Sequence, residues 1–218
     1  MHSGAAGVPA EVAESAAPRR AFCARCLRAQ VACICQWITP LQSSVELLIL
    51  QHPLEVGNAK NSARLLHLSV QPSTMVVGET FDAAALTALL EAGGRTPLLL
   101  YPDTPGDRSL GIAPPPACDA ALLDDPARLR LVIVDATWRK SRKMLYLNPA
   151  LQTLPRFVLR AMPPSHYRIR KAHAPDQLST LEAAAYALMQ LDAAPAHWQA
   201  LLAAFDGFVG QQLRYVPA

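Results

Sequence analysis

The sequence predicts an α/β protein: a mostly parallel sheet with helices on both faces, preceded by a small module that holds four cysteines. Three observations predict this class. Short apolar runs alternate with longer amphipathic stretches along most of the chain, the clearest run (131–134) is apolar at every position, and four cysteines lie within thirteen residues near the N-terminus. Strands that are apolar on both faces are typical of parallel sheets, because helices cover both sides.

The 218 residues divide into three regions. Residues 1–18 are rich in Ala, Gly, Pro and Ser without hydrophobic periodicity, which indicates a disordered tail. Residues 19–40 contain the cysteines. Residues 41–218 are long enough to bury one core and are expected to form the main domain.

Each strand of the main domain is predicted from a short apolar run, and each helix from a longer stretch with helical spacing of apolar residues. Asp82 is placed to cap the second helix, and Gly93-Gly94 to end it. A Pro- and Asp-rich loop covers 102–126. Strands are expected at 45–50, 74–77, 97–101, 129–135 and 156–160, and helices at 58–68, 82–91, 138–147, 178–191 and 195–213.

The cysteines favour a metal site, with Cys23, Cys26, Cys33 and Cys35 as the ligands. Four thiolates saturate one tetrahedral Zn²⁺ and leave no open position, so such a site holds structure and performs no chemistry. A disulfide framework would need an oxidising compartment, and no secretory signal is visible. A redox pair would be expected at a helix start without a second cysteine pair nearby.

The charge is distributed unevenly. Between residues 126 and 171 the chain has eleven Lys or Arg and one acid, whereas the rest has nine basic and sixteen acidic residues. A basic surface of this kind favours a polyanion such as nucleic acid, although a solvated basic helix face is the alternative. No apolar run is long enough to cross a bilayer, so we expect a cytoplasmic protein without a membrane partner.

Asp135 lies at the carboxyl end of the clearest strand and is followed by Thr137 and Trp138. In open α/β sheets ligands bind beyond these strand ends, so a carboxylate, a hydroxyl and an aromatic ring are expected to converge there. The alternative is an Asp that only caps the next helix.

A second group of polar residues is Ser179, Thr180 and Glu182, ahead of an apolar helix. Ser179 and Glu182 have capping-box spacing, which needs no ligand. A helix N-terminus is also a good position for a carboxylate, and Thr180, which the box does not use, is expected to keep a free hydroxyl.

With these motifs in this order, the chain resembles the DTW-domain family, and within it the bacterial tRNA-uridine aminocarboxypropyltransferases. The resemblance runs from Cys23 to about Leu213. Ala136 departs from the Gly of some members, and Ser62 from a common Thr. The positions that carry it are the four cysteines, 38–40, His52-Pro53 with Glu55, 61–65, Tyr101-Pro102, Asp135-x-Thr-Trp138, Lys143-Met144, Leu154-Pro155, Tyr167-Arg-Ile-Arg170 and Ser179-Thr180-x-Glu182.

The resemblance implies transfer of the 3-amino-3-carboxypropyl group of S-adenosylmethionine to N3 of a uridine in tRNA, with release of methylthioadenosine. It also implies a fold similar to the SPOUT methyltransferases, with a knotted core. Asp135 is then expected to be, or to orient, the general base. Trp138 would stack on a base, and Asp135, Thr137, Trp138 and Glu182 form the expected catalytic group.

For the donor, the resemblance implies binding by Tyr101, Asp135, Ser179, Thr180 and Glu182. The hydroxyls and amides of Ser179 and Thr180 are suited to bind the carboxylate of the donor. Glu182 or Asp135 is suited to bind its ammonium group. The basic window would hold the tRNA, helped by the zinc module. The expected RNA-binding residues are Arg139, Lys140, Arg142, Lys143, Tyr167, Arg168, Arg170 and Lys171.

Three alternatives stay open from the sequence. A SPOUT-like methyltransferase would release S-adenosylhomocysteine, a zinc-containing RNA-binding protein would bind no S-adenosylmethionine, and a thiol oxidoreductase would cycle the Cys23 and Cys26 pair. The oligomeric state and the tRNA position are not predicted.

Overall fold

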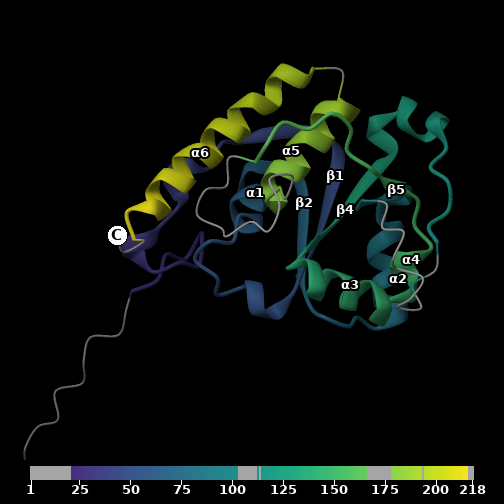
Figure 1. Ribbon diagram of the computed structural model, residues 1–218, viewed down its shortest axis with the longest axis horizontal. Helices are drawn as coiled ribbons and strands as arrows, with labels where there is room; N and C mark the ends of the chain where they lie inside the picture. Colours follow the sequence, from purple (N-terminus) through teal and green to yellow (C-terminus); the bar gives the residue numbers. More distant parts are fainter. Residues whose placement is uncertain (1–20, 103–111, 113, 166–177, 193, 216–218) are drawn as a thin grey trace, which may run out of the picture.

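A five-stranded sheet, parallel at every pairing, forms the centre of the molecule, with the strand order β2-β1-β4-β3-β5 (Figure 1). The computed structural model describes residues 21–102, 112, 114–165, 178–192 and 194–215. The predicted α/β class with a parallel sheet is therefore confirmed. The strands are β1 Leu41–Gln51, β2 Val70–Val77, β3 Thr96–Leu100, β4 Leu129–Asp135 and β5 Arg156–Phe157.

In the part of the chain that the structure describes, six α-helices cover the two faces of the sheet (Figure 1). The first face carries α1, α5 and α6, and the second carries α2, α3 and α4. The α-helices are α1 Ala63–Ser69, α2 Ala83–Glu91, α3 Trp138–Leu147, α4 Pro149–Gln152, α5 Thr180–Leu191 and α6 Gln199–Leu213. The 3-10 helices are η1 Gln30–Ala32, η2 Cys35–Trp37, η3 Pro53–Glu55, η4 Ala92–Gly94, η6 Ala120–Asp124, η7 Pro126–Arg128 and η8 Pro195–Trp198.

Alternation along β1 builds one core on each face. Leu47 and Ile49 belong to the core with α1, α5 and α6, whereas Leu48 and Leu50 belong to the core with α2, α3 and α4. Successive side chains of a strand point to opposite faces, so a run that is apolar at every position fills both cores. This is the physical reason that the continuous apolar runs predicted the parallel sheet.

Most predicted elements are found, and the differences have local causes. β4 and α3 have the predicted bounds. The helix expected from residue 58 begins only at Ala63, because Asn58 and Asn61 accept hydrogen bonds from the backbone N–H groups of Lys60 and Ala63 and hold turns instead. β5 ends at Phe157 rather than at residue 160.

The register of the sheet brings the ends of β1 and β4 together. Gln51 lies beside Asp135, and the backbone N–H of His52 donates to the Asp135 carbonyl at 3.0 Å. Parallel strands end at the same edge of a sheet, so the loops that follow β1, β3 and β4 meet there.

The cysteine module packs against α6. The Trp37 ring lies so close to Gly207 that an added Cβ would come within 2.2 Å of it, so only glycine permits this contact. Trp37 Nε1 donates to Gln211 Oε1, and Gln211 Nε2 donates to the Cys33 carbonyl at 3.0 Å. The module is therefore part of the first core rather than a separate appendage.

Two expectations about the chain as a whole stay predictions. The knot depends on the path through 103–111 and 166–177, and the disordered tail was expected at 1–18; all three segments lie outside the described residues. Among the helices of the described part, none combines the length and apolar character needed to cross a membrane.

Candidate functional site

Asp135 is the centre of a buried hydrogen-bond network at the carboxyl edge of the sheet. Its Oδ2 accepts from Gln51 Nε2 at 2.8 Å and from Asn61 Nδ2 at 2.7 Å, and its Oδ1 accepts from Thr180 Oγ1 at 2.7 Å. The carboxylate therefore joins the end of β1, the start of α1 and the start of α5. Its partners are side chains rather than backbone N–H groups of α3, and the N-cap residue of that helix is Thr137, whose side chain makes no cap hydrogen bond.

The environment of Asp135 favours its protonated form. The residue is 3% exposed, and this burial raises the pKa of its carboxyl group, against the opposing effect of the hydrogen bonds from Gln51, Thr180 and Asn61. A carboxylate with a raised pKa is a stronger base than an exposed one, but three donors already occupy its oxygens. The contacts seen are those of a residue that positions its neighbours, and a role as general base stays a prediction.

The start of α5 differs from what the sequence suggested. The capping box is present, with the Ser179 Oγ accepting from Glu182 N at 3.2 Å and Glu182 Oε2 accepting from Ser179 N at 2.8 Å. The hydroxyl of Thr180 was expected to be free, and this is corrected: it is bonded to Asp135. The capping box does not use the Thr180 hydroxyl, and the tertiary fold brings Asp135 to it as the hydrogen-bond acceptor.

Glu182 is not brought together with Asp135. It is 1% exposed, accepts from Ser165 Oγ at 2.8 and 3.0 Å in addition to the capping bond, and borders a cavity between α5 and α6 with Tyr186 and Asp206. Burial, Glu182 and Asp206 raise the pKa of Tyr186. The expected catalytic and donor-binding roles of Glu182 have no support from this placement, because it lines neither cavity at the sheet edge.

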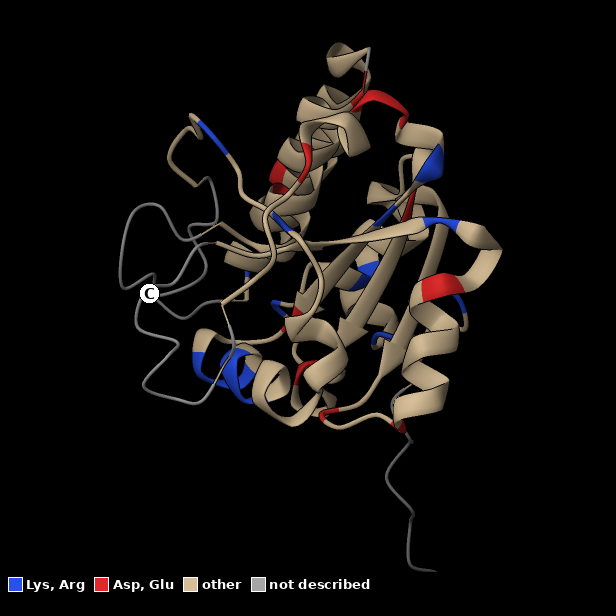
Figure 2. Ribbon diagram, turned by 90° about the vertical axis from the view of Figure 1, so that its right-hand side faces the viewer, with Lys and Arg blue, Asp and Glu red and all other residues tan. Residues whose placement is uncertain are grey.

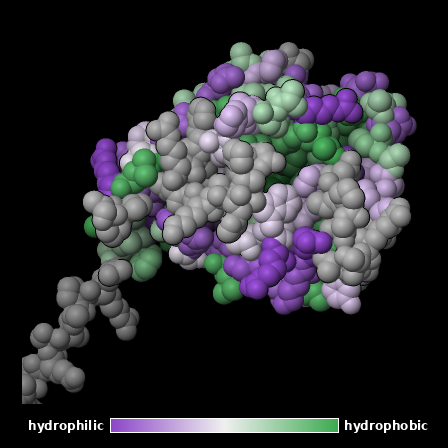
Figure 3. Space-filling view, viewed as in Figure 1, coloured by the Kyte–Doolittle hydropathy of each residue, from purple (hydrophilic) through white to green (hydrophobic). Residues whose placement is uncertain are grey.

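A largely apolar cavity of about 450 Å³ lies at the ends of β3, β4 and β5, beside the start of α5. Figure 3 shows a hydrophobic recess in the region where β4 and α5 lie in Figure 1, above the hydrophilic surface of α3. Its volume is in the range of small-molecule sites. The lining includes Tyr101, Ala136, Trp138, Phe157, Met162 and Thr180.

Trp138 and Tyr101 form an aromatic wall of this cavity. Their rings meet edge to face, with centroids 5.7 Å apart, and Trp138 is 42% exposed. Tyr101 is held by Ser141, whose Oγ lies 2.9 Å from its hydroxyl, and by the Arg156 guanidinium over its ring at 5.2 Å. Tyr101 is buried, and the exposed Trp138 ring that it holds in place is suited to stacking with a planar base.

A smaller, polar cavity of about 110 Å³ adjoins the apolar one, and Ala136, Ser179 and Thr180 line both. Asp135 and Thr137 line only the polar cavity. The loop after β1 supplies the rest of its wall, with Glu55, Asn58, Lys60, Asn61 and Ser62.

The sequence prediction missed this loop as part of the site. Neither Glu55 nor Asn61 was assigned a role in the site, although both follow a strand whose end lies beside Asp135. The available signal was this position after a buried strand, which in a parallel sheet predicts convergence at one edge. Which strands are neighbours, however, is decided by the sheet order.

The basic window is less uniform than its sequence suggests. Arg130 is 2% exposed and bonded to Glu46 at 2.9 Å and to the carbonyls of Leu89 and Leu90, and the buried Arg156 donates to the Pro102 carbonyl. These two arginines hold the fold, because their side chains are directed inward. They do not belong to a surface for a polyanion.

Of the other basic residues in this window that the structure describes, Arg128 and Arg160 lie apart, and four gather on α3 (Figure 2). Lys140 pairs with Glu55 at 3.0 Å, and Lys143 pairs with Glu79 at 2.9 Å, while Arg139 is exposed and Arg142 half-buried. Lys143 and His52 lower the pKa of Glu79. Tyr167, Arg168, Arg170 and Lys171, the other expected RNA-binding residues, lie outside the described residues.

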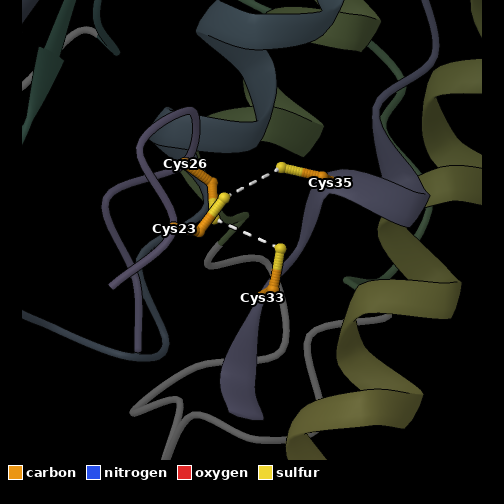
Figure 4. A group of neighbouring side chains, drawn as sticks. All are labelled: Cys23, Cys26, Cys33 and Cys35. Carbon is orange, nitrogen blue, oxygen red and sulfur yellow. Dashed lines mark hydrogen bonds between the residues drawn. The ribbon is translucent and has the colours of Figure 1, made fainter. Parts of the chain in front are cut away.

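The four cysteines converge as predicted (Figure 4). Their sulfur atoms all lie within 4.8 Å of one another, with 3.6 Å between Cys23 and Cys35 and 3.7 Å between Cys26 and Cys33. A tetrahedron with metal–sulfur bonds of about 2.3 Å has edges of about 3.8 Å, whereas a disulfide needs about 2.05 Å. All four are free thiols, and the geometry is that of a metal site.

The electrostatics of the cluster also fit a cation. Backbone N–H groups of Cys26 and Arg25 lower the pKa of Cys23 to about 6, whereas burial and the neighbouring Cys23 sulfur raise the pKa of Cys35 to about 12. Four adjacent thiolates repel one another, so a divalent cation is what would allow all of them to ionise.

Two arginines join the cysteine module to the loop of the polar cavity. Arg28, between the second and third cysteines, donates to the carbonyls of Ala59 and Asn61, the latter at 2.5 Å, and its guanidinium lies 5.1 Å from the centre of the Phe208 ring. Arg64 donates to the Arg25 carbonyl at 2.8 Å. The segment that holds Asp135 through Asn61 is thus fixed from the cysteine side.

Comparison with known proteins agrees with this arrangement. The DTW domain family model matches residues 20–213. A tRNA-uridine aminocarboxypropyltransferase 2 from Mus musculus is 30% identical over 218 residues, covering 96% of this chain and 68% of the relative. One of the same name from Drosophila melanogaster is 33% identical over 196 residues, 84% of this chain and 72% of the relative. A tRNA-uridine aminocarboxypropyltransferase A from Arabidopsis thaliana is 26% identical over 63% of this chain and 55% of its own. No solved structure matches.

Proposed function

Because the chain belongs to the DTW-domain family, we propose that it transfers the 3-amino-3-carboxypropyl group of S-adenosylmethionine to N3 of a uridine in tRNA, with release of methylthioadenosine. One observation carries the proposal. An apolar cavity with an aromatic wall and a polar cavity with charged residues adjoin at the sheet edge, and Ala136, Ser179 and Thr180 line both.

The apolar cavity fits the adenosine part of the donor. Tyr101 and Trp138 offer rings for the adenine, and the remaining wall is largely apolar. The sulfonium of the bound donor supplies an activated alkyl group. The residues of this chain orient that group. Thr180 lines both cavities, and its hydroxyl is fixed by Asp135, which lines the polar one.

A proton must leave N3 of uridine as the new bond forms. Asp135 is our proposal for the residue that accepts it or holds the acceptor in place, since burial raises the pKa of its carboxyl group. The tRNA would lie over α3, where Arg139 and Arg142 add positive charge, and over the segment that contains Arg168 and Arg170.

The four cysteines would hold Zn²⁺. All four ligand positions are then filled by protein, so the ion would stabilise the module and the loop bonded to Arg28 rather than take part in transfer.

The test is a reaction of the purified protein with S-adenosylmethionine and unmodified tRNA, in which small-molecule products and nucleoside masses are measured together. Methylthioadenosine together with an aminocarboxypropyl-uridine is the expected result. S-adenosylhomocysteine with a methylated base would replace the proposal with RNA methylation. Binding of tRNA without either product would indicate an RNA-binding protein.

A further inference from the structure

The polar cavity has a composition that the apolar cavity lacks. Glu55 and Lys60 carry opposite charges, and Asn58, Asn61 and Ser62 add amide and hydroxyl groups. We propose that this cavity binds the α-amino-acid end of the donor, with Glu55 as the acceptor for its ammonium group. The inference rests on the proposed function, and it assigns a part of the donor that the sequence had given to other residues.

The relative sizes of the two cavities support this division. The polar cavity has about 110 Å³ and the apolar one about 450 Å³. An aminocarboxypropyl group has roughly a third as many heavy atoms as methylthioadenosine, so the smaller part of the donor corresponds to the smaller cavity. Both cavities are lined by Ala136, Ser179 and Thr180. The two cavities are therefore adjacent, so a single ligand can occupy both.

Glu55 has the burial and the bonding capacity for an ammonium ligand. It is 7% exposed, its Oε1 accepts from Lys140 Nζ at 3.0 Å, and its Oε2 accepts from Asn58 Nδ2 at 3.0 Å. A carboxylate offers about four acceptor positions, so a further donor can be bound on a group that is already fixed in place. A charge-assisted hydrogen bond in such a sheltered position is stronger than one in water.

The other two candidate carboxylates are less suitable. Asp135 is bonded to three side chains from the protein, and Glu182 borders a different cavity, where Ser165 and the capping box use its oxygens. For the carboxylate end of the ligand, Lys60 provides a positive charge on the same cavity as Glu55. The cavity therefore offers Glu55 to the ammonium group and Lys60 to the carboxylate of a zwitterionic ligand.

Three ligands separate this binding from that of the adenosine part. S-adenosylmethionine carries the ammonium and the carboxylate, decarboxylated S-adenosylmethionine keeps only the ammonium, and methylthioadenosine has neither. Calorimetric titration of the full-length protein with each gives their dissociation constants. We expect Glu55→Gln to weaken S-adenosylmethionine and its decarboxylated form at least about tenfold, and methylthioadenosine less than about twofold.

Two control variants test whether Glu55 acts only by holding α3. Glu79→Gln is the same substitution and also removes a lysine pair from α3, but Glu79 lines neither cavity at the sheet edge, so all three affinities should stay within about twofold. Lys140→Gln removes the partner of Glu55 and leaves its carboxylate, so the affinity for S-adenosylmethionine should stay or rise.

The result separates this inference from the function on which it rests. If wild type binds neither S-adenosylmethionine nor methylthioadenosine, the proposed function fails, and the inference fails with it. If wild type binds both and Glu55→Gln leaves S-adenosylmethionine unaffected, or weakens all three ligands equally, the ammonium site is elsewhere and only this inference is overturned. The same holds if Lys140→Gln is as damaging as Glu55→Gln.

Discussion

At the scale of single residues, Asp135 shows how one side chain can have structural and chemical importance together. Its oxygens accept from Gln51, Asn61 and Thr180, which come from three separate elements. Replacing Asp135 by alanine would leave buried donors without an acceptor. Replacing it by asparagine would keep one oxygen that can accept hydrogen bonds from them. The two kinds of substitution should therefore have different consequences.

We predict that Asp135→Ala lowers the free energy of unfolding by roughly 2 kcal/mol or more, because buried amide donors of Gln51 and Asn61 lose their acceptor. Asp135→Asn should cost little stability, since its oxygen can accept from both amides and its NH2 can donate to Thr180. Urea unfolding at neutral pH measures both. Equal losses for the two variants would contradict the network.

The same Asp135→Asn variant should lose transfer by at least about a hundredfold while binding tRNA within about twofold of wild type. The reason is that the carboxylate charge disappears, whereas the buried residue has no exposed surface to contribute to the tRNA interface. Single-turnover kinetics and a filter-binding assay give the two quantities. A loss of tRNA affinity with chemistry at the full rate would rule out the role.

The pH dependence of stability should also reveal Asp135. Burial raises the pKa of its carboxyl group, so the folded state holds the proton more tightly than the unfolded chain, where Asp titrates near about 3.9. As pH rises from about 4 through the folded pKa, wild type should lose stability relative to Asp135→Asn, and the difference should then level off. Urea unfolding of both proteins across this range checks the sign, and an opposite slope would show that the hydrogen bonds outweigh burial.

At the scale of elements, α3 illustrates that a basic sequence is not the same as a basic surface. Two of its lysines are paired with Glu55 and Glu79, which follow β1 and β2, while Arg139 is exposed. These ion pairs fix the helix against the loops of the site. On α3, the exposed Arg139 is therefore the position from which we expect positive charge to reach a polyanion.

We predict that Arg139→Gln reduces the slope of log affinity for tRNA against log salt by about one, because one phosphate contact is lost. Lys143→Gln is the matched comparison, with the same charge change on the same helix but in a residue paired with Glu79, and should have a smaller effect. Binding titrations at several salt concentrations measure this. An unchanged slope for Arg139→Gln would remove α3 from the interface.

The link between the cysteine module and the loop after η3 is a second feature at this scale. Arg28 reaches the carbonyls of Ala59 and Asn61 with one guanidinium, a geometry that a lysine cannot reproduce. We predict that Arg28→Lys weakens S-adenosylmethionine binding severalfold with an unchanged metal content. Arg25→Lys, the same substitution at an exposed position of the module, is the control. Equal affinities for both variants would mean that the link does not influence the site.

At the scale of the whole molecule, the cysteine cluster and the central sheet share one core. Cys26 and Ile34 are buried in the same cluster of side chains as Leu131 and Phe208. A substitution that disrupts the module should therefore lower the stability of the whole chain and not only that of the module.

We predict one zinc ion per chain by mass spectrometry, and a fall in Tm of at least about 5 °C when it is removed by a chelator. Cys26→Ser should have a similar effect, whereas Cys118→Ser should not, because Cys118 lies outside the cluster. Full stability of the metal-free protein would contradict a structural ion.

Local patterns in the sequence predict most of the elements and the four-cysteine cluster. Continuous apolar runs predict strands that fill two cores, the bounds of β4 and α3 follow from local pattern, and the spacing of four cysteines within thirteen residues limits them to one site. Each of these patterns can be recognised from residues that are close in the chain.

The tertiary structure decided which polar groups meet. The order β2-β1-β4-β3-β5 places Gln51 beside Asp135, brings Asn61 and Thr180 to the same carboxylate, and puts Glu55 into the polar cavity, while Glu182 is directed elsewhere. These contacts join residues far apart in the chain. Local pattern predicts that a strand exists but not which strand becomes its neighbour, because strand order is selected by the packing of both cores at once.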